Sequence, residues 1–156
     1  MRIRSLSGWL AGLSVGVLLF IKSAAAFEPV IQLTVSGTSK PVISGTTNLP
    51  DDTPLMVSIQ VAREDAAHPG HILYPVMGQQ GVSVHDHHFS TGPFSMDGSP
   101  YDRGIYIANV AISNLVLPDS VKPILGDMGR KIGGPNVKVG ALDTPYFEVH
   151  QTFEVR

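Results

Sequence analysis

Histidine is the residue type in this sequence whose spacing could support chemistry. Five of the six histidines fall in two short segments, His68-Pro-Gly-His71 and His85-Asp-His-His88. In an extended chain the side chains of residues i and i+2 point to the same face, so His85 and His87 could reach one ion together. Imidazole nitrogens are common ligands of Zn²⁺ and Cu²⁺. One hypothesis is therefore a Zn²⁺ or Cu²⁺ site made by His85, His87 and His88, with His68 or His71 as a further ligand.

Two other interpretations of these histidines need no cofactor. A polar loop exposed to solvent accounts for the same residues without any ligand. A pH-sensitive contact is the third interpretation, because imidazole side chains change charge near neutral pH.

The sequence contains few candidate residues for other kinds of catalysis. The chain has no cysteine, which excludes a thiol nucleophile, a cysteine-ligated zinc site and an iron–sulfur cluster. No spacing of Ser, His and Asp selects a nucleophile beside an oriented base, and no H-E-x-x-H or G-x-G-x-x-G occurs. The glycine-rich stretch Gly126–Gly134 is interpreted as a structural loop. We therefore expect a protein without enzymatic activity.

The first 26 residues have the three zones of a secretory signal peptide. Arg2 and Arg4 precede an apolar run at Leu6–Ile21, and small residues follow at Ala24–Ala26. This order predicts cleavage before Phe27 and export to the periplasm or the extracellular space.

An uncleaved membrane anchor is the alternative for this segment. The apolar run of about 16 residues ends at Lys22 and is shorter than the roughly 20 residues that cross a bilayer. Cleavage removes three of the 11 basic residues against 13 acidic ones and leaves a net charge of −5. Because a mildly acidic body with scattered basic residues does not attract phosphate backbones, nucleic acid is excluded as a partner, and a membrane is a partner only if the leader stays uncleaved.

The rest of the chain has the two-residue periodicity of β-strands. Four strands are predicted at Ile31–Ser36, Leu55–Ala62, Gly104–Ser113 and Tyr146–Val155, and shorter ones at Pro41–Ser44, Ile72–Met77, Val82–His85 and Phe89–Phe94. The best helical candidates are Arg63–Ala67 and a turn at Lys122–Leu125. Residues 27–156 are therefore expected to form one all-β domain, an antiparallel immunoglobulin-like β-sandwich of about seven strands, with a small β-barrel as the alternative.

A turn motif supports this fold by resemblance. The string Ile43–Leu55, with Asn48 and Pro50 in its turn, resembles the G-T-T-N-L-P-D-G-T-x-L stretch of small exported bacterial proteins with an immunoglobulin-like or fibronectin-like sandwich. Asp52 stands where that pattern has glycine. The resemblance covers most of residues 30–155 and implies a fold but no activity.

Two further positions fit the same fold. Gly104 and Tyr106 are similar to the G-x-Y of those proteins, and Gly104 gives the chain freedom to enter its strand. Tyr106 can bury its ring while its hydroxyl bonds a backbone group upstream, as in a tyrosine corner. A plain core or surface tyrosine is the alternative.

These observations favour an exported domain that acts by contact with an envelope protein or a surface polymer. A periplasmic Zn²⁺ or Cu²⁺ binder is the second hypothesis. An enzyme whose site is assembled across loops is the third.

Overall fold

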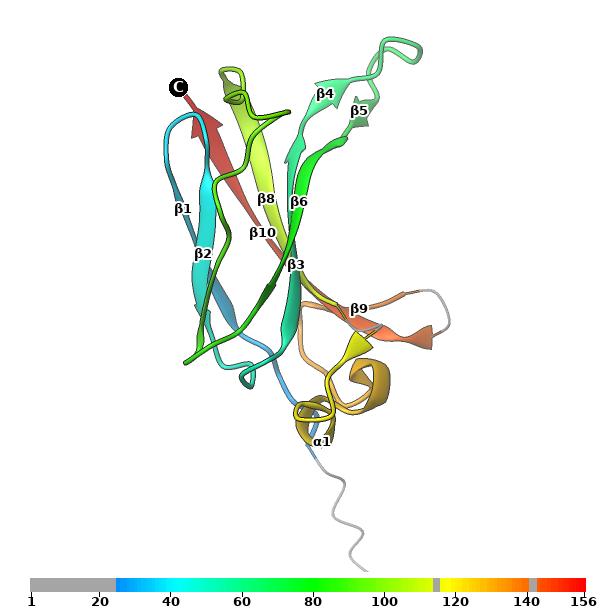
Figure 1. Ribbon diagram of the computed structural model, residues 1–156. Helices are drawn as coiled ribbons and strands as arrows, with labels where there is room; N and C mark the ends of the chain where they lie inside the picture. The colour runs from blue at the N-terminus through cyan, green and yellow to red at the C-terminus, as the bar shows by residue number, and fades with distance from the viewer. Residues whose placement is uncertain (1–24, 114–115, 141–142) are drawn as a thin grey trace, which may run out of the picture.

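The fold is an antiparallel sandwich of two β-sheets. The computed structural model describes residues 25–113, 116–140 and 143–156, so the predicted leader lies outside the described residues except for Ala25 and Ala26. The three-stranded sheet has the order β1 (Ile31–Ser36), β2 (Val42–Thr47) and β7 (His88–Ser90). The five-stranded sheet has the order β6 (Val76–Ser83), β3 (Pro54–Val61), β8 (Gly104–Ile112), β10 (Pro145–Val155) and β9 (Val137–Val139). The two sheets face one another in Figure 1.

The core lies between the sheets and follows from strand alternation. In β3, Leu55, Val57 and Ile59 are at most 1% exposed, and the residues between them face outward. Ile43 of β2 and Phe89 of β7 pack from the opposite sheet, at 0% and 4% exposure. Each such side chain contributes about 1.5–3 kcal/mol when it leaves water, so this alternation specifies which face of each sheet is buried. The expected all-β sandwich is confirmed.

Short elements cover one end of the sandwich. The helix α1 (Lys122–Leu125) and the 3-10 helix η2 (Asp127–Gly129) lie below the sheets in Figure 1. Leu125 is fully buried, and a parallel bridge joins Phe27 to Ile132 beside these helices. The predicted turn at Lys122–Leu125 is thus one turn of α-helix. No helix in the described part of the chain is both long and apolar enough to cross a bilayer.

A two-stranded arm extends β3 and β6 beyond the sandwich. It consists of β4 (Arg63–Glu64) and β5 (Ile72–Leu73), and Figure 1 shows it projecting from the end opposite the helices. The prediction of a helix at Arg63–Ala67 is therefore wrong. Arg63 and Glu64 pair with Leu73 and Ile72, and strand pairing across the arm outweighs the helical propensity of so short a segment.

Some strand boundaries also differ from those expected. β6 is continuous through two glycines, although the predicted strands stopped at residue 77 and resumed at residue 82. β9 was not predicted, because three residues are too few for a periodic pattern. The described residues contain ten strands, of which eight make up the two sheets.

Candidate functional site

The segment His85–His88 forms a tight turn between β6 and β7. The backbone N–H of His85 donates to the His88 carbonyl oxygen at 2.8 Å, and the His88 N–H donates back at 2.8 Å. Asp86 and His87 have φ angles of 48° and 62°, as in the type I′ turns of β-hairpins. The alternation that would place His85 and His87 on one face holds only in extended backbone, so it does not apply across this turn.

The turn Met96–Ser99 has the same form as the histidine turn, and the two differ in the residue at the third position. Met96 and Ser99 exchange backbone hydrogen bonds of 2.9 and 2.8 Å, and Asp97 and Gly98 between them have φ angles of 49° and 83°. His87 occupies the position that Gly98 holds in this turn. A left-handed backbone costs an L-residue roughly 1–2 kcal/mol, so His87 keeps a strained conformation at an exposed tip.

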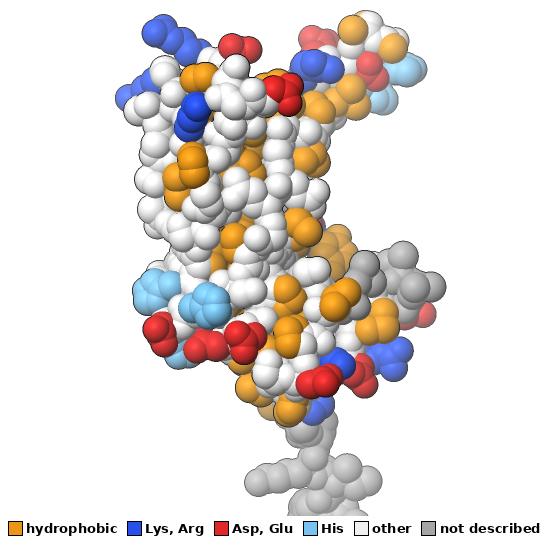
Figure 2. Space-filling model, in the orientation of Figure 1, with side chains coloured by type: hydrophobic (Ala, Val, Ile, Leu, Met, Phe, Trp, Pro, Cys, Tyr) orange, Lys and Arg blue, Asp and Glu red, His pale blue; other side chains and the backbone are white. Residues whose placement is uncertain are grey.

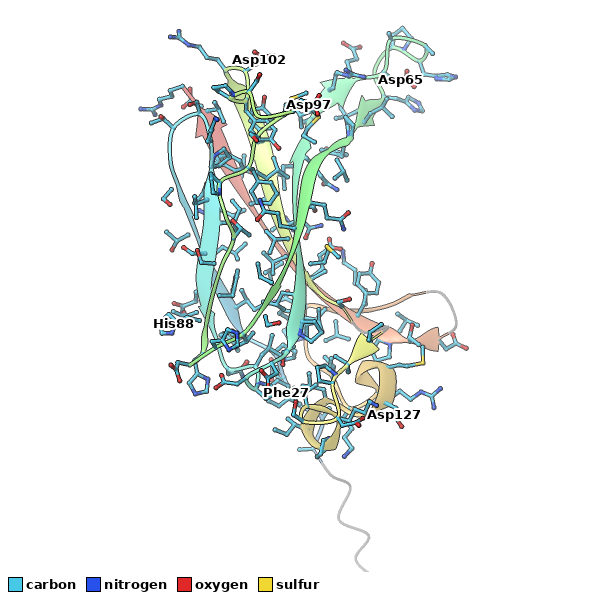
Figure 3. All side chains as sticks on the ribbon, viewed as in Figure 1. Phe27, Asp65, His88, Asp97, Asp102 and Asp127 are labelled. Carbon is cyan, nitrogen blue, oxygen red and sulfur yellow. The ribbon has the colours of Figure 1, made fainter. Side chains whose placement is uncertain are left out.

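The two histidine segments lie at opposite ends of the molecule. His68 contacts Asp65 with 2.9 Å between Nδ1 and Oδ2, and Figure 3 places Asp65 at the tip of the arm and His88 at the far end of the sandwich. Figure 2 shows the same separation of the histidine side chains. His71 is on the arm with His68, where their rings are 5.9 Å apart. Within the described ranges, no three His, Asp or Glu side chains converge as metal ligands would.

The turn closes one end of an open groove between the sheets. From His85 and His88, β6 runs into the five-stranded sheet and β7 into the three-stranded sheet, and Figure 1 shows the two diverging. Farther along, the side chain of Gln80 bridges them: its Oε1 accepts from the Gly92 N–H at 3.0 Å, and its Nε2 donates to the Gly92 carbonyl oxygen at 3.4 Å. The groove has a volume of about 1050 Å³.

The lining of the groove is uncharged apart from its two histidines. Leu33, Leu55, Val82 and Phe89 supply an apolar floor. Hydroxyl groups come from Thr34, Ser44, Thr46, Ser83, Ser90 and Ser113. Among the described residues that line the groove, none is Asp, Glu, Lys or Arg. Such a lining suits a ligand that is uncharged and can form hydrogen bonds.

Asn48 holds the segment before β1 against the sandwich. Its Oδ1 accepts from the Val30 N–H at 2.8 Å, and its Nδ2 donates to the Glu28 carbonyl oxygen at 2.9 Å. Its backbone N–H also donates to the Val30 carbonyl oxygen at 3.3 Å. This asparagine therefore has a structural role at the end of β2.

Pro50 begins the turn that leads into β3. Its carbonyl oxygen accepts from the Thr53 N–H at 3.2 Å and from the Thr53 hydroxyl at 2.6 Å. Asp52, which replaces the glycine of the resembled motif, has a φ angle of 66°. The left-handed backbone is thus present here without glycine, and aspartate is one of the few other residues that adopt it readily.

Tyr106 has the geometry of a tyrosine corner. Its hydroxyl donates to the Asp102 carbonyl oxygen at 3.0 Å, and its ring packs edge-on against Tyr101 with centroids 5.4 Å apart. The ring also stacks on Phe153, with centroids 5.9 Å apart. Gly104 is the first residue of β8. Burial raises the pKa of Tyr106, and the negative charge of Asp102 adds to that increase.

The arm carries the other distinctive surface. Ile72, Leu73, Tyr74 and Val76, in β5 and at the start of β6, are each 43–54% exposed. At its tip, the Ala67 N–H donates to the Asp65 carboxylate at 2.9 Å, and this hydrogen bond, with that of the His68 side chain, lowers the pKa of Asp65. The tip of the arm is thus a hydrogen-bonded turn, and exposed apolar residues follow it in the chain.

The groove was not predicted from the sequence. The hydroxyl residues that line it come from five separate segments between Thr34 and Ser113, and none forms a motif. One signal was present: residues 72–83 contain no charged residue. An uncharged run of that length marks a strand without the charges that usually protect an exposed edge.

Comparison with known proteins adds no assignment. No family model matches the chain, and neither the curated proteins nor the solved structures contain a match. The resemblance to small exported sandwich proteins stays a prediction.

Proposed function

We propose that this protein is an exported, non-enzymatic binding domain that holds an envelope protein at the groove between β6 and β7. The groove is the observation that carries this proposal. Its volume of about 1050 Å³ is at the upper end of the range for ligand sites, and it opens to solvent. The predicted leader supports export, and export would place the groove among envelope components.

The chemistry of the lining favours recognition by hydrogen bonds and apolar contact. The floor of the groove is apolar, and its walls carry hydroxyl groups and two histidines. The lining therefore has no Asp, Glu, Lys or Arg that could pair with a strongly charged partner. Both a polypeptide segment and a neutral glycan could supply matching groups. We favour a polypeptide, since the groove lies beside the open edge of a β-sheet and extended peptides bind such edges.

Site-specific photocrosslinking in the cells that make the protein tests this function. A photoreactive amino acid replaces Ser90 in the groove of the full chain, and a control carries it at Thr152, which is exposed on the outer face of the five-stranded sheet. We expect one discrete crosslinked polypeptide from the Ser90 position and none from Thr152.

Two results would contradict the proposal. A product that resists protease and is removed by glycosidases identifies a surface polymer as the partner. Equal products from both positions, or none from either, indicate that the groove is not the binding surface. Amino-terminal sequencing of the same material tests export directly, because a cleaved chain would begin at Phe27.

A further inference from the structure

β6 is the outermost strand of the five-stranded sheet and pairs only with β3. Its last hydrogen bonds show which of its backbone groups face that partner. The N–H of Val84, the residue after β6, donates to the Thr53 carbonyl oxygen at 3.1 Å. The Val84 carbonyl oxygen accepts from the Asp52 N–H at 2.9 Å. Both backbone groups of Val84 therefore point toward β3.

Alternate residues of β6 must point their backbone groups the other way. In an antiparallel strand, the N–H and C=O groups of successive residues face opposite sides. Counting back from Val84, the outward-facing residues are Gln79, Gly81 and Ser83. All three are exposed, and across the described chain no hydrogen bond joins their backbone groups to another residue. β6 thus presents three N–H donors and three C=O acceptors along an open edge.

Part of this edge lacks charged protection against pairing. Natural sheets often block their edges with charged side chains, yet β6 spans eight residues without a charge. An irregularity interrupts its pairing with β3 at Met77, whose carbonyl oxygen accepts from the Tyr101 hydroxyl at 3.2 Å, so the open part of the edge begins at Gln79. A Cβ atom added at Gly81 would meet no atom within 4 Å, so the face of the sheet at the middle of β6 is open. The apolar floor of the groove, at Val82 and Phe89, lies beside the same part of β6.

We propose that β6 binds an extended, uncharged peptide segment of the partner protein by β-strand addition. This inference rests on the proposed function and specifies its mode of recognition. The segment runs antiparallel to β6 as a sixth strand of the sheet and lies along the mouth of the groove. Its main chain pairs with Gln79, Gly81 and Ser83. Every second side chain of the bound segment points to the apolar floor. Its affinity therefore depends on the alternation of apolar and polar residues more than on which residues they are.

A peptide titration followed by NMR tests the mode of binding on the wild-type chain. The probe is acetyl-Thr-Val-Thr-Val-Thr-Val-Thr-amide, which is uncharged and alternates as the groove requires. Two analogues carry N-methyl groups either on all valines or on all threonines. Because only alternate amides of the peptide face β6, one analogue should bind at least about tenfold more weakly, and the other should bind like the parent. The amide signals of Gly81 and Ser83 should shift on binding.

Two substitutions at one position provide the matched protein variants. Gly81→Pro removes the outward N–H of residue 81 and leaves the hydrogen bonds to β3 in place. Gly81→Ala retains this N–H, and its side chain meets no atom within 4 Å. We expect Gly81→Ala to bind the parent peptide within about twofold of wild type, and Gly81→Pro to lose at least about tenfold. If Gly81→Pro does not fold, the N-methyl analogues on the wild-type protein decide the question.

Any of three results overturns strand addition: no binding of the parent peptide, equal affinities of the two analogues, or shifts confined to β1. Each leaves the proposed function standing if Ser90 still crosslinks to a polypeptide. If the Ser90 crosslink is absent but the two N-methyl analogues differ in affinity, the proposed partner is rejected and the edge is still a peptide-binding site.

Discussion

Replacement of His87 by glycine should stabilise the protein. His87 has a φ angle of 62°, and left-handed backbone costs an L-residue roughly 1–2 kcal/mol. Glycine removes that cost but loses about 0.5–1 kcal/mol more conformational entropy on folding. The hydrogen bond from the Thr47 N–H to the His87 carbonyl oxygen, 2.9 Å long, involves only backbone and is retained. The expected net gain in unfolding free energy is therefore about 0–1.5 kcal/mol.

The reciprocal substitution supplies a control within the same chain. Gly98 has the matching position in the other type I′ turn, and a Cβ atom there would meet nothing within 4 Å. Gly98→His should therefore destabilise the protein by a similar amount through backbone strain alone. Because Figure 3 shows Asp97 and His88 at opposite ends, the two effects should add in the double variant to nearly zero.

Equilibrium unfolding in urea measures all three variants. The midpoint should rise for His87→Gly and fall for Gly98→His with an unchanged slope, and thermal midpoints should move by about 1–4 °C. A His87→Gly protein that is less stable than wild type would refute the reasoning. It would mean that the His87 side chain makes a stabilising contact that outweighs the strain of its backbone.

Three further predictions concern structural residues. Tyr106→Phe should cost about 1 kcal/mol in urea unfolding through loss of its hydroxyl hydrogen bond. Because burial raises the pKa of Tyr106, folding favours its neutral form, so wild-type stability should fall as the pH rises above about 10, and Tyr106→Phe should show a smaller fall. Asn48→Ala should lower the unfolding free energy by about 1–3 kcal/mol and speed proteolysis before residue 31, whereas unchanged proteolysis would refute its anchoring role. Gly45→Ala should expose the core to a fluorescent dye, because its Cβ atom would lie within 2.8 Å of the Phe89 ring and closer still to the Gln32 carbonyl oxygen; a native-like thermal midpoint would contradict this.

Strand alternation made much of this fold predictable. Leu55, Val57 and Ile59 lie at every second position, and their burial follows from the period of a strand alone. Arg63–Glu64 could not be predicted in the same way. That segment pairs only because the β3–β6 hairpin continues beyond the sheet, and a tertiary context of that kind leaves no local pattern.

The candidate site was less predictable than the fold. The histidines drew attention through their chemistry, yet His85 and His88 lie at the closed end of a groove whose character comes from other residues. The unpaired edge at Gly81 and Ser83 depends on which strand ends a sheet, and strand order is a property of the folded chain. Only the absence of charge in β6 was visible beforehand.

The projecting arm has a practical consequence for anyone who wishes to label this protein. Its tip, residues 66–70, is exposed and stands clear of both sheets in Figure 1. A fluorophore attachment sequence inserted between Ala67 and His68 would lengthen the tip without entering either ladder of hydrogen bonds. The arm thus offers a labelling site at the end of the molecule opposite the histidine turn.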